Sequence, residues 1–430
     1  MRRATSLRFR TVFLPLAATL MLAVVVGGCE HISLPFMSSQ PSRTPPSPAV
    51  GKVEPQKPAV VPLSEVMAAP PEETPAVATS PDTNAAIAAG PARAALLLPL
   101  SGPSASIGEA MLNSAQMALF ETADDTLVLQ PYDTHGTPEG AAQAAATALE
   151  QGARIILGPV FSASVKAVAP KARAASVGVV SFSTDTTAAG EGVYLTGFLL
   201  RQQVQRVVQF ARSRGLEKFA VLAPSTEYGR AVVTALRETV AAASGTVAHV
   251  EFYDPQAQEQ TAPVRRLVAR QPFDAVLLAD KGARLKALAS LLPYYDVDPQ
   301  KVRLLGTQMW ADTDFRGDQN LLGGWFATPS SPLQKPFADR YRALYGTAPP
   351  ANSSLAYDAV ALAANLARTP GGANFSREAL TSEVGFSGID GIFRLRPEGL
   401  AERGLAVMEV TADGPTEISP APTTFEKPLY

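Results

Sequence analysis

From Ala92 onward, short apolar runs alternate with longer segments whose apolar residues are spaced as on one face of a helix. Residues 94–98 are continuously apolar, which is typical of a strand that is buried on both faces of a sheet. Ser101-Gly102-Pro103 interrupts this run, and a helix is predicted after the break. The apolar face of that helix comprises Ile107, Met111, Ala115, Ala118 and Leu119.

The same alternation continues as far as Leu292. Strands are predicted at 127–129, 155–157, 179–182, 219–222, 247–253 and 275–278. Helices are predicted at 138–151, 164–175, 202–214, 229–243 and 283–292. This order predicts an α/β fold with parallel sheets that are covered by helices on both faces. The length exceeds what a single core usually serves, so two lobes are expected.

The loops after the predicted strands are the expected place for a binding site. In open parallel sheets, ligands bind beyond the carboxyl ends of the strands. We therefore expect functional side chains in five loops, at 101–106, 133–136, 158–164, 181–187 and 224–228.

The composition fits a globular body, with 430 residues, 46% of them hydrophobic, and a net charge of −2. No excess of basic residues suggests a nucleic-acid partner, and none is expected. Beyond the N-terminal segment, no apolar run in the sequence is long enough to span a membrane.

The N-terminal segment has the organisation of a secretion signal. Arginines in the first ten positions precede an apolar run at 11–26, and Gly27 and Gly28 precede Cys29, the only cysteine. This arrangement resembles the bacterial lipobox, in which the cysteine is lipidated and becomes the new N-terminus. We expect residues 1–28 to be a removed signal peptide and Cys29 to anchor the protein in the inner or outer membrane, facing the periplasm of a bacterial cell envelope.

An ordinary signal peptide or a membrane span with a chance cysteine are the alternatives for this segment. The apolar run is short for a span, which needs about 20 residues. A lone cysteine in an exported protein would otherwise be an exposed free thiol.

Residues 29–91 differ in composition from the rest of the chain, being rich in Pro, Ala, Ser, Thr and Val. Proline cannot donate a backbone hydrogen bond, and it biases its neighbour toward extended conformations. Such a segment is expected to be a disordered, partly extended tether that links the anchor to the folded body. A spacer of no particular function is the alternative.

Short motifs in the alternating part of the chain occur in a recognisable order. They are Leu98-Pro99-Leu100-Ser101-Gly102-Pro103 with Gly108, Tyr132-Asp133-Thr134 ahead of Pro138-Glu139, Gly158-Pro159-Val160-Phe161-Ser162, Tyr228-Gly229, and 337–346 followed by Ala356-Tyr357-Asp358. In this order and spacing, the chain resembles the type I periplasmic binding proteins of the leucine/isoleucine/valine-binding class. The resemblance covers nearly all of residues 92–412.

The resemblance implies a two-lobed fold in which each lobe is a parallel sheet flanked by helices. Three crossovers would form a hinge, with the chain leaving lobe 1 near Gly197, returning near Gly306 and crossing again near Gly388. Lobe 1 would comprise about 92–199 and 306–387, and lobe 2 about 200–305 and 388–412. Residues 413–430 would be a C-terminal tail.

In the amino-acid binders of this family, the serine of the Gly-Pro-x-x-Ser loop and the next loop hold the ligand carboxylate. The resemblance assigns that role to Ser162, with Ser181, Ser183 and Thr184 on the following loop. Hydroxyl and N–H groups at a helix N-terminus bind anions well, and Ser164 is expected to open a helix there. The alternative is that Ser162 and Ser164 only cap this helix.

Two residues depart from the amino-acid-binding pattern. Asp185 stands where the family usually has a threonine, and an ionised Asp would repel a ligand carboxylate. In the second lobe, Arg284 stands near the position of the acid that holds a ligand's amino group, with Asp280 close by. These changes argue against a simple free amino acid as the ligand.

Aromatic side chains are candidate walls for the cleft. Tyr228 is the one that we expect there. Trp310, Trp325 and Phe326 are further candidates, with core packing as the alternative and more common role.

No catalytic motif is present, and neither an enzyme activity nor a cofactor is expected. The three histidines, His31, His135 and His249, are scattered, without the spacing of a metal site. The sequence contains no Gly-x-Ser-x-Gly elbow, no phosphate-binding loop and no Ser-x-x-Lys. Asp312 and Asp314 form a weak cation motif, and the capping of turns is the alternative for them.

Two functions are compatible with these features. The first is a non-catalytic binding module that captures a small polar, amino-acid-like ligand for an ABC permease or a sensor. The second is a regulator that activates a penicillin-binding protein, and thus a peptidoglycan synthase, by protein contact. Related lipoproteins with this fold as a domain have that role, and the tether and the altered cleft residues favour it. The helical-repeat domain of their best-known members is not expected here.

Overall fold

The computed structural model describes residues 90–122 and 125–425. The predicted signal peptide, Cys29 and nearly all of the predicted tether lie outside the described residues. None of the helices in the two described ranges has both the length and the apolar character needed to cross a membrane.

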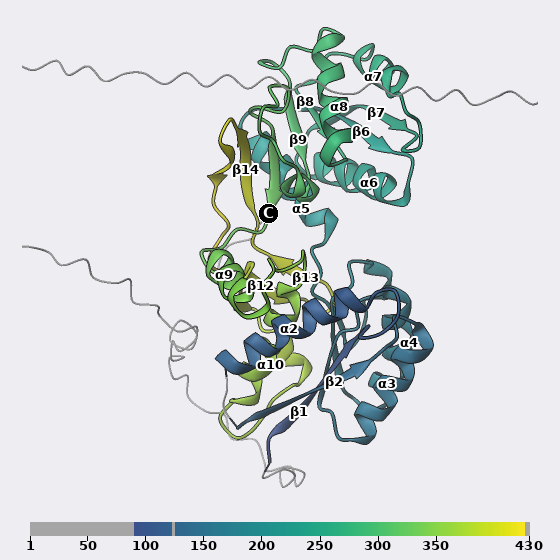
Figure 1. Ribbon diagram of the computed structural model, residues 1–430. Coiled ribbons are helices and arrows are strands. Elements are labelled where there is room, and N and C mark those ends of the chain that lie inside the picture. The colour runs from purple at the N-terminus through teal and green to yellow at the C-terminus, as the bar shows by residue number, and fades with distance from the viewer. Residues whose placement is uncertain (1–89, 123–124, 426–430) are drawn as a thin grey trace, which may run out of the picture. The chain divides into compact units, whose positions relative to one another are not determined.

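A five-stranded parallel sheet, with strand order β2-β1-β3-β4-β5, forms the first lobe (Figure 1). Its strands are β1 (Ala92–Leu98), β2 (Leu127–Asp133), β3 (Ile155–Leu157), β4 (Gly178–Ser181) and β5 (Val193–Leu195). Alternate residues of β1 serve two cores, with Leu96 and Leu98 in one and Ala95 and Leu97 in the other. This explains why β1 carries a continuous apolar run.

Helices cover both faces of this sheet (Figure 1). One face is covered by α2 (Ala105–Glu121), α9 (Gln334–Tyr345) and α10 (Ser354–Ala367). The other face is covered by α3 (Pro138–Glu150) and α4 (Ser162–Ala174). The short helices η1 (Thr186–Ala188) and α11 (Arg377–Leu380) complete the lobe.

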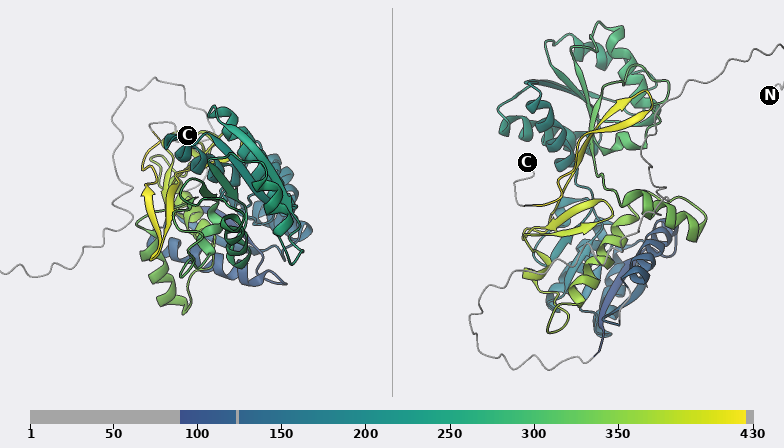
Figure 2. Two further views of the ribbon diagram at one scale, coloured as in Figure 1. Left: turned by 90° about the horizontal axis from the view of Figure 1, so that it is seen from above. Right: turned by 90° about the vertical axis from the view of Figure 1, so that its left-hand side faces the viewer.

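A seven-stranded sheet, with strand order β15-β14-β10-β9-β8-β6-β7, forms the second lobe. Its strands are β6 (Lys218–Pro224), β7 (Thr246–Tyr253), β8 (Ala275–Leu278), β9 (Arg303–Gly306), β10 (Trp325–Thr328), β14 (Ala406–Thr411) and β15 (Gly414–Ser419). The β14–β15 hairpin, yellow in Figure 2, is antiparallel and adds the last two strands at one edge. The helices are α5 (Leu200–Ser213) and α6 (Glu227–Ala242) on one face, and α7 (Thr261–Val268) and α8 (Gly282–Tyr294) on the other.

A small antiparallel sheet packs against the core of the first lobe. It consists of β11 (Phe386–Gly388), β12 (Gly391–Leu395) and β13 (Ala401–Arg403). Phe393, Leu395 and Ala401 join the core that contains α2 and α10. The segment 388–403, which we expected in lobe 2, therefore packs on lobe 1.

The strand pairings show that two of the three crossovers lie at other positions than we expected. The chain leaves the first lobe between β5 and α5, around Gly197. Because β9 and β10 both belong to the seven-stranded sheet, the chain returns after Thr328, and the expected position near Gly306 is wrong. The last crossover follows β13, at Gly404 and Leu405, rather than near Gly388. Part of the expected C-terminal tail is β15, paired with β14. Strand partnership is a long-range property, and the local apolar pattern does not encode it.

Two glycines of the quoted motifs allow helices to begin directly against the end of the preceding strand. A Cβ atom at Gly108 would lie 2.1 Å from the carbonyl oxygen of Pro99. A Cβ atom at Gly229 would lie 1.9 Å from the carbonyl oxygen of Pro224. Both separations are far below van der Waals contact, so only glycine permits this close packing of α2 and α6.

Candidate ligand-binding site

A cavity of about 640 Å³ lies beyond the carboxyl ends of β4, β6 and β9. One wall is the loop after β4, which contributes Thr184 and Asp185. The other wall comes from the first turn of α6, with Tyr228, and from η2 (Gln308–Asp312). The position agrees with the general rule for open α/β sheets, and the volume suits a small molecule.

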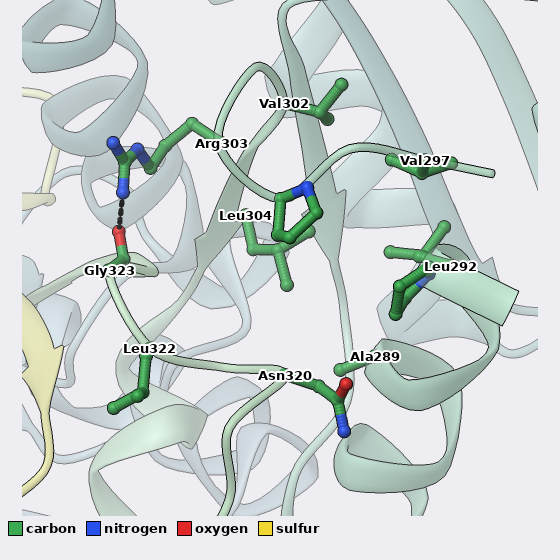
Figure 3. Close-up of a pocket in the computed structure, with 11 residues that line it drawn as sticks. Ala289, Leu292, Val297, Val302, Arg303, Leu304, Asn320, Leu322 and Gly323 are labelled. Atoms are coloured by element: carbon green, nitrogen blue, oxygen red, sulfur yellow. Dashed lines mark hydrogen bonds between the residues drawn. The ribbon is translucent and has the colours of Figure 1, made fainter.

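A second cavity, between α8, β9 and the loop at Asn320, is shown in Figure 3. Its volume is about 10 Å³, no more than the space of one water molecule. On its rim, Arg303 donates a hydrogen bond to the carbonyl oxygen of Gly323. A space of this size cannot hold an organic ligand.

Of the six residues expected to contact a ligand, Thr184 and Tyr228 line the larger cavity. Tyr228 is half-buried, and its hydroxyl lies 2.8 Å from the hydroxyl of Thr307, at the end of β9. Burial raises the pKa of Tyr228 to about 12, so its hydroxyl keeps its proton at neutral pH. The tyrosine therefore links α6 to the end of β9 at the wall of the cavity.

Three of the expected serines are buried and form hydrogen bonds within the protein. Ser181 donates to the carbonyl oxygen of Pro159 at 2.8 Å and accepts from the N–H of Ser183 at 3.1 Å. The Ser183 hydroxyl accepts from the N–H of Asp185 at 3.2 Å, and Ser164 donates to the carbonyl oxygen of Thr137 at 3.3 Å. These bonds shape the loop that carries Thr184 and Asp185.

Ser162 is the first residue of α4, and its hydroxyl contributes to lowering the pKa of the nearby Asp185 carboxyl. The N-cap position belongs to Phe161, which makes no side-chain cap bond. The structure therefore shows neither Ser162 nor Ser164 as a helix cap.

Gln203 forms a part of the cavity that the sequence pattern did not single out. Its Oε1 accepts from the N–H of Gln308 at 3.0 Å, and its Nε2 donates to the carbonyl oxygen of Phe198 at 3.2 Å. Gln203, Gln308 and Phe198 all line the cavity, as does Asn352 next to α10. The only sequence signal for Gln203 is a polar residue among apolar neighbours on the buried face of α5.

The residues that depart from the amino-acid-binding pattern occupy different places. Asp185 lines the cavity, whereas Arg284 and Asp280 do not. Asp280 accepts a hydrogen bond from the Tyr253 hydroxyl and lies 3.6 Å from Nε of Arg284. The expected second-lobe position is therefore engaged in a separate polar cluster.

The other aromatic candidates belong to the core of the second lobe. Trp310, Trp325 and Phe326 are all buried. Trp310 packs against Phe326 with ring centroids 6.0 Å apart. Phe182 and Phe198, which the sequence pattern did not indicate, line the cavity instead.

The two aspartates of the weak cation motif are both paired with basic side chains. Asp312 lies 3.2 Å from Nζ of Lys281, and Asp314 accepts two hydrogen bonds from Arg316 at 2.9 Å. Among the residues that the structure describes, no three His, Cys, Asp or Glu side chains are grouped as metal ligands. His135 lies 3.0 Å from Asp133 in an exposed loop.

A buried arginine connects the segments through which the chain passes between the sheets. Arg403, the last residue of β13, donates to the carbonyl oxygen of Thr196 at 2.8 and 3.1 Å. Its guanidinium lies over the rings of Phe198 and Phe393, 4.8 and 4.9 Å from their centroids. The first and third crossovers are thus joined next to the cavity.

The sequence matches the periplasmic binding protein family over residues 91–415. A putative branched-chain amino acid ABC transporter of Rhodospirillum rubrum aligns with a TM-score of 0.67 at 19% identity, covering 76% of this chain and 100% of that one. A leucine binding protein of Thermotoga maritima aligns with a TM-score of 0.54 at 21% identity, covering 76% of this chain and 98% of that one.

An uncharacterized protein of Rickettsia prowazekii is 22% identical over 222 residues. The match covers 49% of this chain and 59% of that protein, so the chain spans less than two thirds of its relative's length. The match to the family extends over both sheets and the cavity between their strand ends. The chain belongs to the periplasmic binding protein family.

Proposed function

We propose that this protein is a non-catalytic, periplasm-facing solute-binding protein that captures a small polar ligand for an ABC permease or a sensor. The observation that carries the proposal is the cavity at the strand ends, with Thr184, Tyr228 and Gln203 among its lining residues. Binding proteins of two α/β lobes close around a ligand because the closed state binds it more tightly. The names of the solved relatives, a leucine binding protein and a putative branched-chain amino acid ABC transporter, support small-molecule transport.

Thermal unfolding of the purified protein with single amino acids, short peptides, amines and muropeptides tests this function. A ligand at a hundred times its Kd stabilises the folded state by about 2.7 kcal/mol, which is a readable shift. The shift should shrink in Tyr228→Ala and persist in the matched control Tyr294→Ala, because Tyr294 is exposed and lies outside the cavity. A ligand-induced shift that is equal in both variants would contradict the site.

The lipid anchor belongs to the same proposal. The signal-like segment and Cys29 support it. Expression in bacteria with a radiolabelled fatty acid should label the wild-type protein and leave Cys29→Ser unlabelled. Equal labelling of both proteins would contradict lipidation at Cys29.

A regulator of a peptidoglycan synthase is the second candidate function. The Pro- and Ala-rich segment between Cys29 and the folded body favours it, because such a segment could carry the body away from the membrane. Crosslinking in intact cells should then recover a penicillin-binding protein. Recovery of an ABC permease alone would contradict this second function.

A further inference from the structure

In the loop after β4, the carboxylate of Asp185 lies among several hydrogen-bond donors. Oδ1 of Asp185 accepts from the N–H and the hydroxyl of Thr187, at 3.0 and 2.7 Å. Oδ2 lies 3.5 Å from Nζ of Lys166, which also donates to the Thr187 hydroxyl at 2.8 Å. The Ser162 hydroxyl lies nearby and also favours the ionised form of this carboxylate.

Asp185 is ionised under all ordinary conditions. The hydrogen bond from the Thr187 hydroxyl is the largest cause, and the Thr187 N–H, Ser162 and Lys166 add to it, so that the pKa falls to about 2. Two hydroxyls, one N–H and one ammonium around a single carboxylate are the groups from which an anion site is built. In this protein the Asp185 side chain occupies the space among these groups in which a bound anion would otherwise lie.

The rest of the cavity offers no positive group to a second anion. Asp185, Glu227 and Asp312 line it, and its lining contains no lysine, arginine or histidine. Lys281, which is not among the lining residues, is paired with the lining residue Asp312 at 3.2 Å. A ligand carboxylate in contact with Asp185 would meet a like charge, which costs about 1 kcal/mol at 4 Å in water and several times more in a drier site.

We propose that Asp185 fills the carboxylate position of the cavity from within, and that the cavity therefore takes an organic amine or amide without a free carboxylate. The ligand class rests on the proposed solute-binding function, whereas the filled anion position does not. An ammonium group would be attracted by the three carboxylates, and Thr184, Gln203 and Gln308 would supply neutral hydrogen-bonding groups.

Rescue by acetate tests the filled anion position separately from any ligand. Asp185→Ala removes the internal carboxylate and leaves the Ser162 hydroxyl, the Thr187 N–H and hydroxyl, and the Lys166 ammonium in place. Sodium acetate should raise the melting temperature of this variant relative to sodium chloride of equal concentration, and it should not raise that of the wild type. Asp312→Ala is the matched control, because Asp312 is also a lining carboxylate and pairs with Lys281 at 3.2 Å. Absence of rescue in Asp185→Ala, or equal rescue in Asp312→Ala, overturns the inference.

A matched pair of probes, leucine and leucinamide, tests the ligand class by calorimetry. They share the side chain and the amine, and only leucine has a carboxylate. Wild type should bind leucinamide at least tenfold more tightly than leucine, and Asp185→Ala should reverse or abolish this preference. Leucine binding to wild type as tightly as leucinamide overturns the inference.

The acetate rescue and the calorimetry together distinguish a failure of this inference from a failure of the proposed function. If acetate rescues Asp185→Ala but no small molecule of the panel binds wild type, the filled anion position stands and solute binding is contradicted. If Asp185→Ala fails to fold, Asp185→Ser takes its place, since a serine hydroxyl can still accept from the Thr187 N–H at the start of η1.

Discussion

Nη1 of Arg403 lies 3.9 Å from Oδ2 of Asp358, and the two side chains are only 1% and 2% exposed. Arg403 ends β13 just before the last crossover, and Asp358 is on α10 in the first lobe. The Oδ1 atom of Asp358 accepts from the N–H of Ile389 at 2.7 Å. This pair therefore joins α10, the small sheet and, through Thr196, the first crossover.

Arg403→Met is expected to lower the free energy of unfolding by about 3–5 kcal/mol. The change removes the cation beside the buried Asp358 carboxyl and the donors to Thr196. Urea unfolding of wild type and variant measures the effect. The same substitution at Arg201, which is 69% exposed and pairs with Glu238 at 3.3 Å, should cost less than about 1 kcal/mol. Equal effects at the two sites would show that the buried pair has no special role in stability.

The stability of the protein should depend on pH through Asp358. Burial, assisted by the nearby carboxylate of Asp390, raises the pKa of Asp358 from 3.8 to about 7, against the opposing effect of Arg403. The folded state therefore binds a proton more tightly than the unfolded chain does. Its contribution to stability is complete below pH 3.8 and is lost as the pH rises toward about 7.

Asp358→Asn isolates this titration from that of other groups. The free energy of unfolding of wild type, minus that of Asp358→Asn, should fall between about pH 4 and pH 7 and then level off. Urea unfolding across this range measures the difference. A difference that rises with pH would mean that Arg403 outweighs burial and that the pKa of Asp358 is lowered.

Gly229→Ala should destabilise the protein by about 1–3 kcal/mol, because its methyl group would overlap the carbonyl oxygen of Pro224. The sign is informative, since alanine in a helix is otherwise favoured over glycine by about 0.5–1 kcal/mol. Gly90→Ala is the control, because a Cβ there meets no atom within 4 Å. Thermal unfolding distinguishes them, and a stabilised Gly229→Ala would contradict the close packing of α6 on β6.

Tyr228→Phe should reduce stability by about 1–3 kcal/mol, because it keeps the ring but leaves the buried Thr307 hydroxyl without this partner. Tyr294→Phe, at an exposed tyrosine, should change stability by less than about 0.5 kcal/mol. Chemical denaturation of both variants checks the difference. A neutral Tyr228→Phe would mean that water replaces the tyrosine hydroxyl beside Thr307.

Most elements of the two parallel sheets could be predicted from the sequence, because their signals are local. The run at 155–157 is β3, and 275–278 is β8, at the predicted residues. Buried parallel strands are continuously apolar, and the helices that cover them are amphipathic. The local pattern of each segment therefore predicts whether it is a strand or a helix. The order of the motifs also indicated the family that the match over 91–415 shows.

The late strands and the crossovers depended on tertiary structure. Nothing in the sequence near Gly306 indicates that β10 joins β9 in the same sheet, or that β14 runs antiparallel to β10. Pairing energy comes from partners far apart in the chain, and a local pattern carries no information about which partner is chosen.

The candidate site likewise combines features that the sequence predicts with features that depend on the tertiary structure. From the sequence alone one could predict which loops lie at the strand ends, and that Thr184, Asp185 and Tyr228 belong to them. The folded arrangement was needed to show that Ser164 and Ser181 face inward and that Gln203 lines the cavity. It was also needed to show that donors from α4 and η1 surround Asp185. Residue type determines what a side chain can bind, whereas the packing of separate elements determines whether that capacity is already used within the protein.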